Sequence, residues 1–269
     1  TPVNKGEANR TNPKAELSDE EQMERAARKL LKAQVNRAID ELPEDEVSDR
    51  VRNEVEPTQD ELDTFVEEMM SIVTGLLVAY GIEEFTKGLK SGNLTILPEQ
   101  GFQLTDEAKD AYTLYLRRVA ESYSNDTAEA IRKVLADANE FGYTRRETEK
   151  ALANVMNTSD YRVKRLARTE LNHSQNIGKL EGMKQLASQT GTKWEKTITH
   201  AGKSNICPLC ASQEGVWVAV EEPLWAFGAT IEADDEDGNP VIYNNDWMSL
   251  EAQDYHPNGT GTLVFRRTE

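Results

Sequence analysis

Hydrophobic residues recur at every third or fourth position over most of the first 190 residues, and this spacing predicts amphipathic helices. The first helix is predicted from about residue 19 to residue 42, before Pro43. Its hydrophobic side chains form one stripe along an otherwise charged helix. We expect four residues of this stripe to dock onto a partner protein, because helices commonly bury one hydrophobic face in a partner's groove: Leu30, Leu31, Val35 and Ile39.

Further helices are marked by residues that favour a helix start. In three places a hydroxyl residue precedes a glutamate by three positions, so that each side chain can accept a hydrogen bond from the other residue's backbone N–H. The pairs are Ser18 and Glu21, Thr58 and Glu61, and Thr144 and Glu147. A break between two helices is predicted at Ser124-Asn125-Asp126. The predicted helices cover about residues 59–88, 105–122, 125–140, 144–157 and 159–186.

The hydrophobic pattern changes after Gly191. Short runs with Trp, Val and Ile alternate with Gly, Pro and Asn, and Asp237-Gly238-Asn239 predicts a turn between strands. The predicted fold is therefore α+β, with a mostly helical N-terminal half followed by a helix and a small β-rich C-terminal domain. Its parts are a polar flexible arm at 1–18, a helical docking region at 19–125, and a C-terminal domain at 126–269, with helices at 126–190 and a β-rich unit at 191–269.

Charge and hydropathy limit the partners of the chain. The net charge is −17, and only residues 161–205 are basic overall, with nine Lys and Arg against three Asp and Glu. Weak, non-specific contact with DNA is therefore expected only through 161–205. The longest hydrophobic run, residues 69–82, is shorter than the roughly 20 residues that span a membrane. We expect it to be a buried helix, and we expect no membrane contact.

The only two cysteines, Cys207 and Cys210, form a C-x-x-C motif that has three interpretations. A redox pair is disfavoured because the motif does not lie in a βαβ pattern. A zinc site would combine both thiolates with His256 and either His200 or Asp254. The favoured interpretation is a structural knuckle in which the two thiols pack as small hydrophobic groups.

The order of several short motifs resembles the Mu F-like head morphogenesis family, which comprises minor head proteins of tailed phages. The resemblance covers roughly residues 130–267. Its most specific parts are Ala167-Arg168-Thr169-Glu170 with Asn172 and Asn176 after it, and C-x-x-C followed by His256-Pro257-Asn258. The motifs are FGYTRRETEKAL, YRVKRLARTELNHSQNIGKLEG, KW, CPLC and HPNG.

The resemblance implies a non-enzymatic minor capsid protein that associates with the portal and with the major capsid or scaffold protein. Such a protein assists head assembly, DNA packaging or genome ejection, and lies inside the virion near the portal vertex after synthesis in the host cytoplasm. Residues 19–125 would then dock onto portal or capsid. Members of the family often continue H-P-N with Cys-Arg-Cys, whereas this chain continues with Gly259-Thr260-Gly261. No cofactor is therefore expected, and zinc is the alternative.

The residues of the helical motif are expected to be structural. Arg168 and Glu170 are two positions apart and point to different faces of a helix, so they cannot act as a simple catalytic pair. Arg168 is expected to tie the long helix to the β-rich unit through a carboxylate or a carbonyl group. The alternative function is a nucleic-acid-binding protein, built either on a zinc knuckle or on a helix-turn-helix over about residues 127–157.

Overall fold

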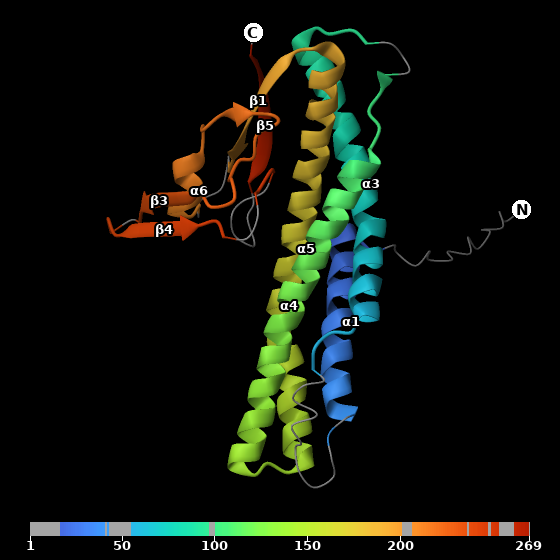
Figure 1. The fold of residues 1–269 in the computed structure, drawn as a ribbon, viewed down its shortest axis with the longest axis vertical. Coiled ribbons are helices and arrows are strands. Elements are labelled where there is room, and N and C mark those ends of the chain that lie inside the picture. Colours follow the sequence, from blue (N-terminus) through green and yellow to red (C-terminus); the bar gives the residue numbers. More distant parts are fainter. Residues whose placement is uncertain are drawn as a thin grey trace, which may run out of the picture.

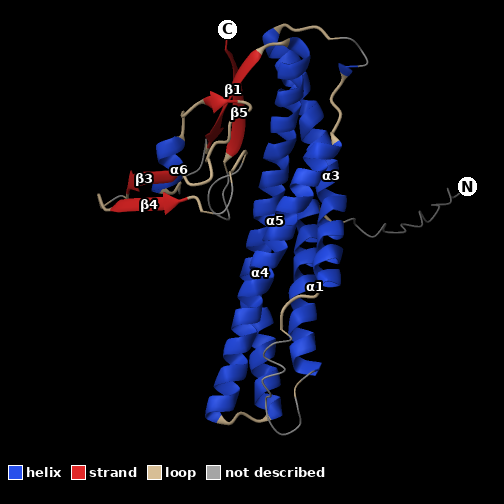
Figure 2. Ribbon diagram, in the orientation of Figure 1, coloured by secondary structure: helices blue, strands red, loops and turns tan. Residues whose placement is uncertain are grey.

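The chain forms an elongated bundle of four long helices, with a small β-rich unit against one side (Figures 1 and 2). Consecutive helices run in opposite directions, and the predicted α+β fold class is confirmed. The helices are α1 (Asp19–Asp40), α3 (Gln59–Gly92), α4 (Asp106–Phe141) and α5 (Arg145–Thr190). The structure is a computed structural model that describes residues 17–40, 42, 55–96, 100–200, 206–235, 237–246, 249–252 and 261–268, without the side chains of 139 and 156–160.

The three predicted helix starts are confirmed. Thr58 and Thr144 begin α3 and α5, and each exchanges hydrogen bonds with the glutamate three positions later. Ser18 forms the same pair of contacts with Glu21 at the start of α1. These contacts satisfy backbone N–H groups that the first helical turn leaves without partners.

The predicted helix breaks are wrong. α4 continues through Ser124-Asn125-Asp126, and α5 continues from Arg145 to Thr190 as one helix of 46 residues. Ser124 and Thr127 are fully buried, so the surrounding bundle favours the helix more strongly than these residues disfavour it. The domain boundary predicted between residues 125 and 126 lies inside α4.

The hydrophobic stripe of α1 is packed inside the chain's own core. Leu30, Leu31 and Val35 are buried, and Ile39 is partly buried against the same interior. Their neighbours come from α3, α4 and α5, so the stripe is covered within the chain. These side chains are therefore not exposed for docking to another protein, which corrects the surface predicted from the sequence.

α3 and α5 approach so closely that side chains do not fit between them. A Cβ atom built at Gly182 would lie 2.4 Å from the carbonyl oxygen of Gly81, and one at Gly178 would lie 2.8 Å from that of Leu77. Atoms cannot pack at such distances, so both positions of α5 require glycine. The two backbones are thus in direct contact over at least one helical turn.

α3 contains the most hydrophobic part of the bundle. By length and composition alone it could cross a membrane, because an 18-residue window has a mean hydropathy of 1.5. Core helices of soluble proteins pass the same test, and a third of the window is buried. Met69, Val73 and Leu77 are fully buried in the bundle core. The expected buried helix is therefore observed, whereas the absence of membrane contact stays a prediction.

The β-rich unit contains two small antiparallel sheets. In the first, β1 pairs with β5 along its whole length and with β2 on its other edge; in the second, β3 and β4 form a hairpin. The turn predicted at Asp237-Gly238-Asn239 joins β3 to β4. The elements are β1 (Lys193–Thr199), α6 (Pro208–Gln213), β2 (Val218–Ala219), β3 (Thr230–Asp234), β4 (Pro240–Asn244) and β5 (Thr262–Thr268).

The contact between α3 and α5 leads to a prediction about glycine substitutions. Gly182→Ala should lower the free energy of unfolding by about 1–3 kcal/mol or more, because its methyl group would meet the backbone of α3. Gly75→Ala is the matched control, because Gly75 is exposed on α3 and has no atom within 4 Å of an added Cβ. The control should stabilise the protein by up to about 1 kcal/mol. Chemical denaturation measures both changes, and equal values for the two variants would contradict the direct backbone contact.

Candidate functional site

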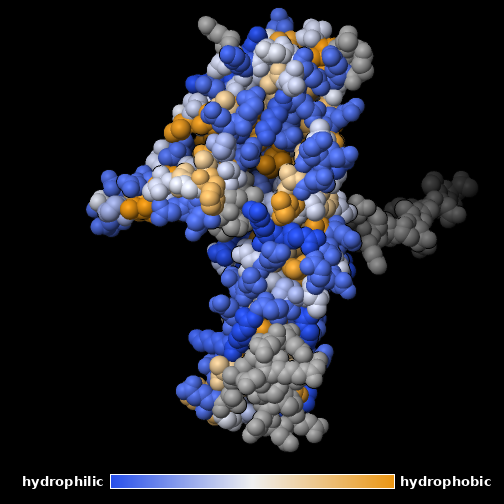
Figure 3. Space-filling view, viewed as in Figure 1, coloured by the Kyte–Doolittle hydropathy of each residue, from blue (hydrophilic) through white to orange (hydrophobic). Residues whose placement is uncertain are grey.

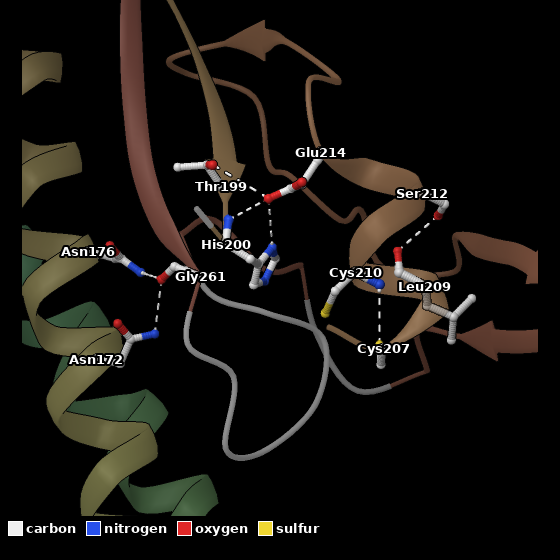
Figure 4. A network of polar contacts seen from close by, with 10 residues as sticks. All are labelled: Asn172, Asn176, Thr199, His200, Cys207, Leu209, Cys210, Ser212, Glu214 and Gly261. Atoms are coloured by element: carbon white, nitrogen blue, oxygen red, sulfur yellow. Dashed lines mark hydrogen bonds and ion pairs between the residues drawn. The ribbon is translucent and has the colours of Figure 1, made fainter. Parts of the chain in front are cut away.

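The asparagines of the helical motif attach the β-rich unit to α5. The side-chain amides of Asn172 and Asn176 both donate to the carbonyl oxygen of Gly261, at 3.1 and 2.9 Å (Figure 4). The backbone N–H of Leu263 donates to the side-chain oxygen of Asn176 at 3.1 Å. Asn176 is buried, so its two bonds are shielded from water, whereas the Asn172 bond is only partly buried. Two motif residues therefore fix the position at which β5 begins.

The HPN motif directly precedes this attachment in the sequence. His256, Pro257 and Asn258 lie outside the described residues, as does Asp254. Gly261 is the first described residue after them, and it accepts the two asparagine bonds. Gly261 is therefore the residue at which the described chain resumes after this segment.

The contacts of Arg168 and Thr169 in the described part of the chain lie within the helical bundle. The Arg168 guanidinium is exposed and lies 3.7 Å from the Glu20 carboxylate in the first turn of α1. Thr169 donates to the backbone carbonyl of Arg165, one turn earlier. Arg168 therefore lies beside α1. Its expected link to the β-rich unit stays a prediction, because several segments of that unit lie outside the described residues. An exposed ion pair of this kind contributes at most about 1 kcal/mol.

Glu170 lies on another face of α5, buried against α4. Its carboxylate accepts hydrogen bonds from Tyr115 at 3.0 Å and from Tyr112 at 3.4 Å. Burial and the nearby negative charge of Glu170 raise the pKa of both phenols well above its ordinary value, so both remain protonated donors. His173 packs against both tyrosine rings, with its Nδ1 atom 3.8 Å from Glu170. Glu170 therefore joins α4 to α5 and, as expected, points away from Arg168.

Cys207 and Cys210 begin the short helix α6. The Cys207 sulfur accepts the backbone N–H of Cys210 at 3.3 Å, which makes Cys207 the N-cap of α6. Cys210 is buried, and Cys207 packs against a small core that contains Leu209 and Trp225. Cys210 thus packs as a small hydrophobic group, as the knuckle interpretation predicts, whereas Cys207 is only partly buried and caps the helix. A redox motif would instead lie between a parallel strand and a helix.

His200 lies at the end of β1 and is held by Glu214, which follows α6. One Glu214 oxygen accepts the His200 backbone N–H at 2.5 Å and lies 3.5 Å from the ring Nδ1 (Figure 4). Within the described part of the chain, no group of three or more His, Cys, Asp or Glu side chains could hold a metal ion. Because His256 and Asp254 lie outside that part, the zinc interpretation of Cys207 and Cys210 stays untested.

The positive charge of residues 161–205 is partly balanced within the chain. Arg162 pairs with Asp126 at 2.9 Å, and Lys184 pairs with Glu251 at 3.0 Å. These pairs leave less charge for phosphate groups, so weak DNA contact stays a prediction without structural support. Residues 127–157 also differ from a helix-turn-helix, because they are the adjoining ends of two long antiparallel helices.

Lys196 is a functional candidate that the sequence did not reveal. Its side chain is fully buried, donates to the Val220 carbonyl at 3.1 Å and lies 4.0 Å from the Glu251 carboxylate. Burial lowers its pKa to about 8, although Glu251 acts in the opposite direction. Lys184 is also partly buried, but attraction by Glu181 and Glu251 outweighs burial and raises its pKa. Glu251 thus lies between a lysine of α5 and a lysine of β1.

Comparisons with known proteins identify no relative: no family model, no curated protein and no solved structure matches the chain.

The knuckle leads to a prediction about the two cysteines. Changing Cys207 and Cys210 together to Ser should leave the domain folded at a cost of about 1–3 kcal/mol, because serine also caps helices and only Cys210 is deeply buried. Circular dichroism would report the fold and elemental analysis the zinc content. Stoichiometric zinc in the unaltered protein, lost together with the fold in the double variant, would show that Cys207, Cys210 and His256 form a metal site.

The buried lysine leads to a prediction about pH. The unfolded chain keeps a proton on Lys196 up to its ordinary pKa of 10.5, whereas the folded protein releases it near pH 8. Between these values the unfolded state binds more protons, so rising pH stabilises the folded state. Relative to Lys196→Met, the unaltered protein should gain up to about 3 kcal/mol of unfolding free energy across this range. Denaturant titrations from pH 7 to pH 10.5 measure the difference in unfolding free energy between the two proteins. If this difference stayed constant, the folded protein would not lower the pKa of Lys196.

Proposed function

We propose that this chain is a non-enzymatic minor head protein of a tailed phage, which associates with the portal and assists head assembly, DNA packaging or genome release. The observation that carries the proposal is the convergence of Asn172 and Asn176 on Gly261. The asparagines belong to the helical motif of the resemblance, and Gly261 lies three positions after Asn258, the last residue of its HPN motif. The helical motif therefore contacts a residue that follows the HPN segment and lies more than 80 positions further along the chain.

The contacts of the other motif residues support a structural role. The Glu170 carboxylate is occupied by two tyrosine hydroxyls, and the Cys207 sulfur caps a helix. Arg168 lies against α1, away from both groups. An active site would bring such groups together around a space for substrate. Here each of them stabilises a different junction of the fold.

The shape of the molecule suggests where a partner would attach. α5 has 46 residues and is therefore about 70 Å long, so the bundle resembles a rod. At the end of the rod that lies away from the β-rich unit, α4 and α5 are joined by a turn with two exposed aromatic residues (Figure 1). Phe141 is 64% exposed and Tyr143 is 41% exposed, with their rings 6.3 Å apart.

Exposed aromatic side chains are typical anchors of protein interfaces. Because the α1 stripe is covered by the chain's own helices, we propose that Phe141 and Tyr143 make the portal contact in its place. Major capsid or scaffold proteins would then meet other surfaces of the rod. With this contact, the protein would lie inside the virion near the portal vertex.

The portal assignment can be tested by co-expression with the portal protein encoded in the same phage genome. The chain should co-purify with the portal oligomer, and the double change Phe141→Ser with Tyr143→Ser should weaken binding at least about tenfold by removing two aromatic anchors. Leu114→Ser is the control, because Leu114 is a similarly exposed hydrophobic residue elsewhere on α4.

Failure of the unaltered chain to bind the portal oligomer would contradict the proposed function. Binding that survives the double change would keep the function and refute only the aromatic contact. Cleavage or modification of a substrate by a chain that binds no portal would favour an enzyme instead.

A further inference from the structure

Two separate hydrophobic cores lie along the length of the bundle. The central core takes buried side chains from all four long helices, whereas the distal core lies toward the turn between α4 and α5, at the end away from the β-rich unit (Figure 1). In the described part of the chain, α3 contributes buried residues to the central core but not to the distal core. The central core is built from residues within 23–31, 62–77, 112–120 and 163–167, and the distal core from residues within 35–42, 128–135 and 152–155, together with Val55.

A layer of buried polar side chains separates the two cores. Gln34 on α1, with Ser124 and Thr127 on α4, lies between the residues that these helices give to the central core and those that they give to the distal core. All three side chains are fully buried. The Gln34 amide donates to the backbone carbonyls of Ser124 and Val55, at 3.1 and 3.2 Å. At this height, α1 and α4 are therefore joined by hydrogen bonds between polar groups.

α5 also presents a polar group at the height of this layer. The Arg162 guanidinium donates to the backbone carbonyl of Tyr123 at 3.3 Å and to the Asp126 carboxylate at 2.9 Å. On α5, Arg162 lies between Val155 of the distal core and Val163 of the central core. The three helices that pass through both cores thus make polar contacts at the same height.

Two atoms of the layer have no hydrogen-bond partner in the described part of the chain. They are the side-chain oxygen of Gln34 and the hydroxyl oxygen of Ser124, and both are buried. A buried polar atom without a partner destabilises the closed structure, because water would supply that partner in the open one. Separation of the helices on the distal side of this layer would give water access to both atoms, which reduces the free energy that opening requires.

The distal core is also the smaller of the two cores. Among the described residues it contains nine buried hydrophobic side chains, against nineteen in the central core. Hydrophobic burial is the main stabilising contribution, so the distal core should open at a lower free energy. On the face drawn in Figure 3, the described surface of the lower rod is mainly hydrophilic. The hydrophobic contacts of this end therefore lie mostly inside it.

We propose that the distal end of the bundle opens as a separate unit while the central core stays folded, with the layer of Gln34 and Ser124 as its boundary. The unit consists of the parts of α1, α4 and α5 that lie beyond this layer. Its opening leaves the central core intact, because the two cores share no buried residue. The unit carries Phe141 and Tyr143, so the positions of these exposed rings change when it opens. This opening does not depend on the proposed role in the phage head.

Native-state hydrogen exchange of the full chain tests the proposal along one helix. After correction for intrinsic exchange rates, the backbone amides of α4 at 128–138 should be protected at least about tenfold less than those at 112–120. The change from strong to weak protection should fall within about one turn of Ser124. Equal protection of the two groups, or a boundary more than two turns from Ser124, would overturn the proposal.

Two matched substitutions on α4 distinguish separate opening from unfolding of the whole bundle. Leu116 in the central core and Leu135 in the distal core are both fully buried, and alanine at either position leaves a cavity. Leu116→Ala should lower the protection of the 112–120 amides at least about tenfold and leave that of the 128–138 amides unchanged. The reason is that the central core keeps the same contacts whether the distal unit is closed or open. Leu135→Ala should lower the protection of both groups, because it destabilises only the fully closed state.

A milder pair of variants makes the same comparison if either leucine variant fails to fold. Val73→Ala removes a smaller volume from the central core, and Val35→Ala removes the same volume from the distal core. Val73→Ala should again leave the 128–138 amides unchanged. An equal fall in the protection of both groups of amides in the central-core variant would show that the bundle opens as one unit, contrary to the proposal.

Discussion

The direct contact between the backbones of α3 and α5 determines the arrangement of the rest of the molecule. Gly178 and Gly182 allow α5 to rest on Leu77 and Gly81 of α3, and any side chain at either glycine would separate the helices. Close packing also multiplies the weak attractions between neighbouring atoms. One turn away, Leu186 and Met183 of α5 pack over Gly88 of α3. The rotation and height of α5 are therefore fixed by α3.

The fixed orientation of α5 explains how one helix serves several neighbours. Its glycines face α3, Glu170 faces α4, and Asn172 and Asn176 face β5. A rotation of α5 by a single residue, about 100°, would turn each of these side chains away from the element that it contacts. The same orientation leaves a cavity of about 230 Å³ between α4 and α5, with Lys184 in its lining.

The sequence predicted local features of the fold more accurately than it predicted partners. Helix starts at Thr58 and Thr144 were predictable because capping involves residues only three positions apart. The hydrophobic stripe on α1 showed that one face of this helix would be buried. Hydrophobic periodicity does not indicate whether that face packs against the same chain or against a partner protein. The break predicted at Ser124 was wrong because burial in the bundle outweighs local preference. The same limit applies to the candidate sites: Asn172 could be selected from its motif, whereas its partner Gly261 and the buried position of Lys196 depend on contacts distant in sequence.

The antiparallel pairing of β1 with β5 has a consequence for the order of folding. β5 lies more than 60 residues after β1, and β2 covers only two residues of the other edge of β1. All four long helices precede β1 in the chain, so the helical bundle can form before β5, the strand that pairs with β1 along its whole length, has been synthesised. During translation, the edge of β1 that pairs with β5 would therefore stay unpaired beside the folded bundle until residues 262–268 leave the ribosome. This interval is when the nascent chain is most exposed to pairing with a strand of another molecule.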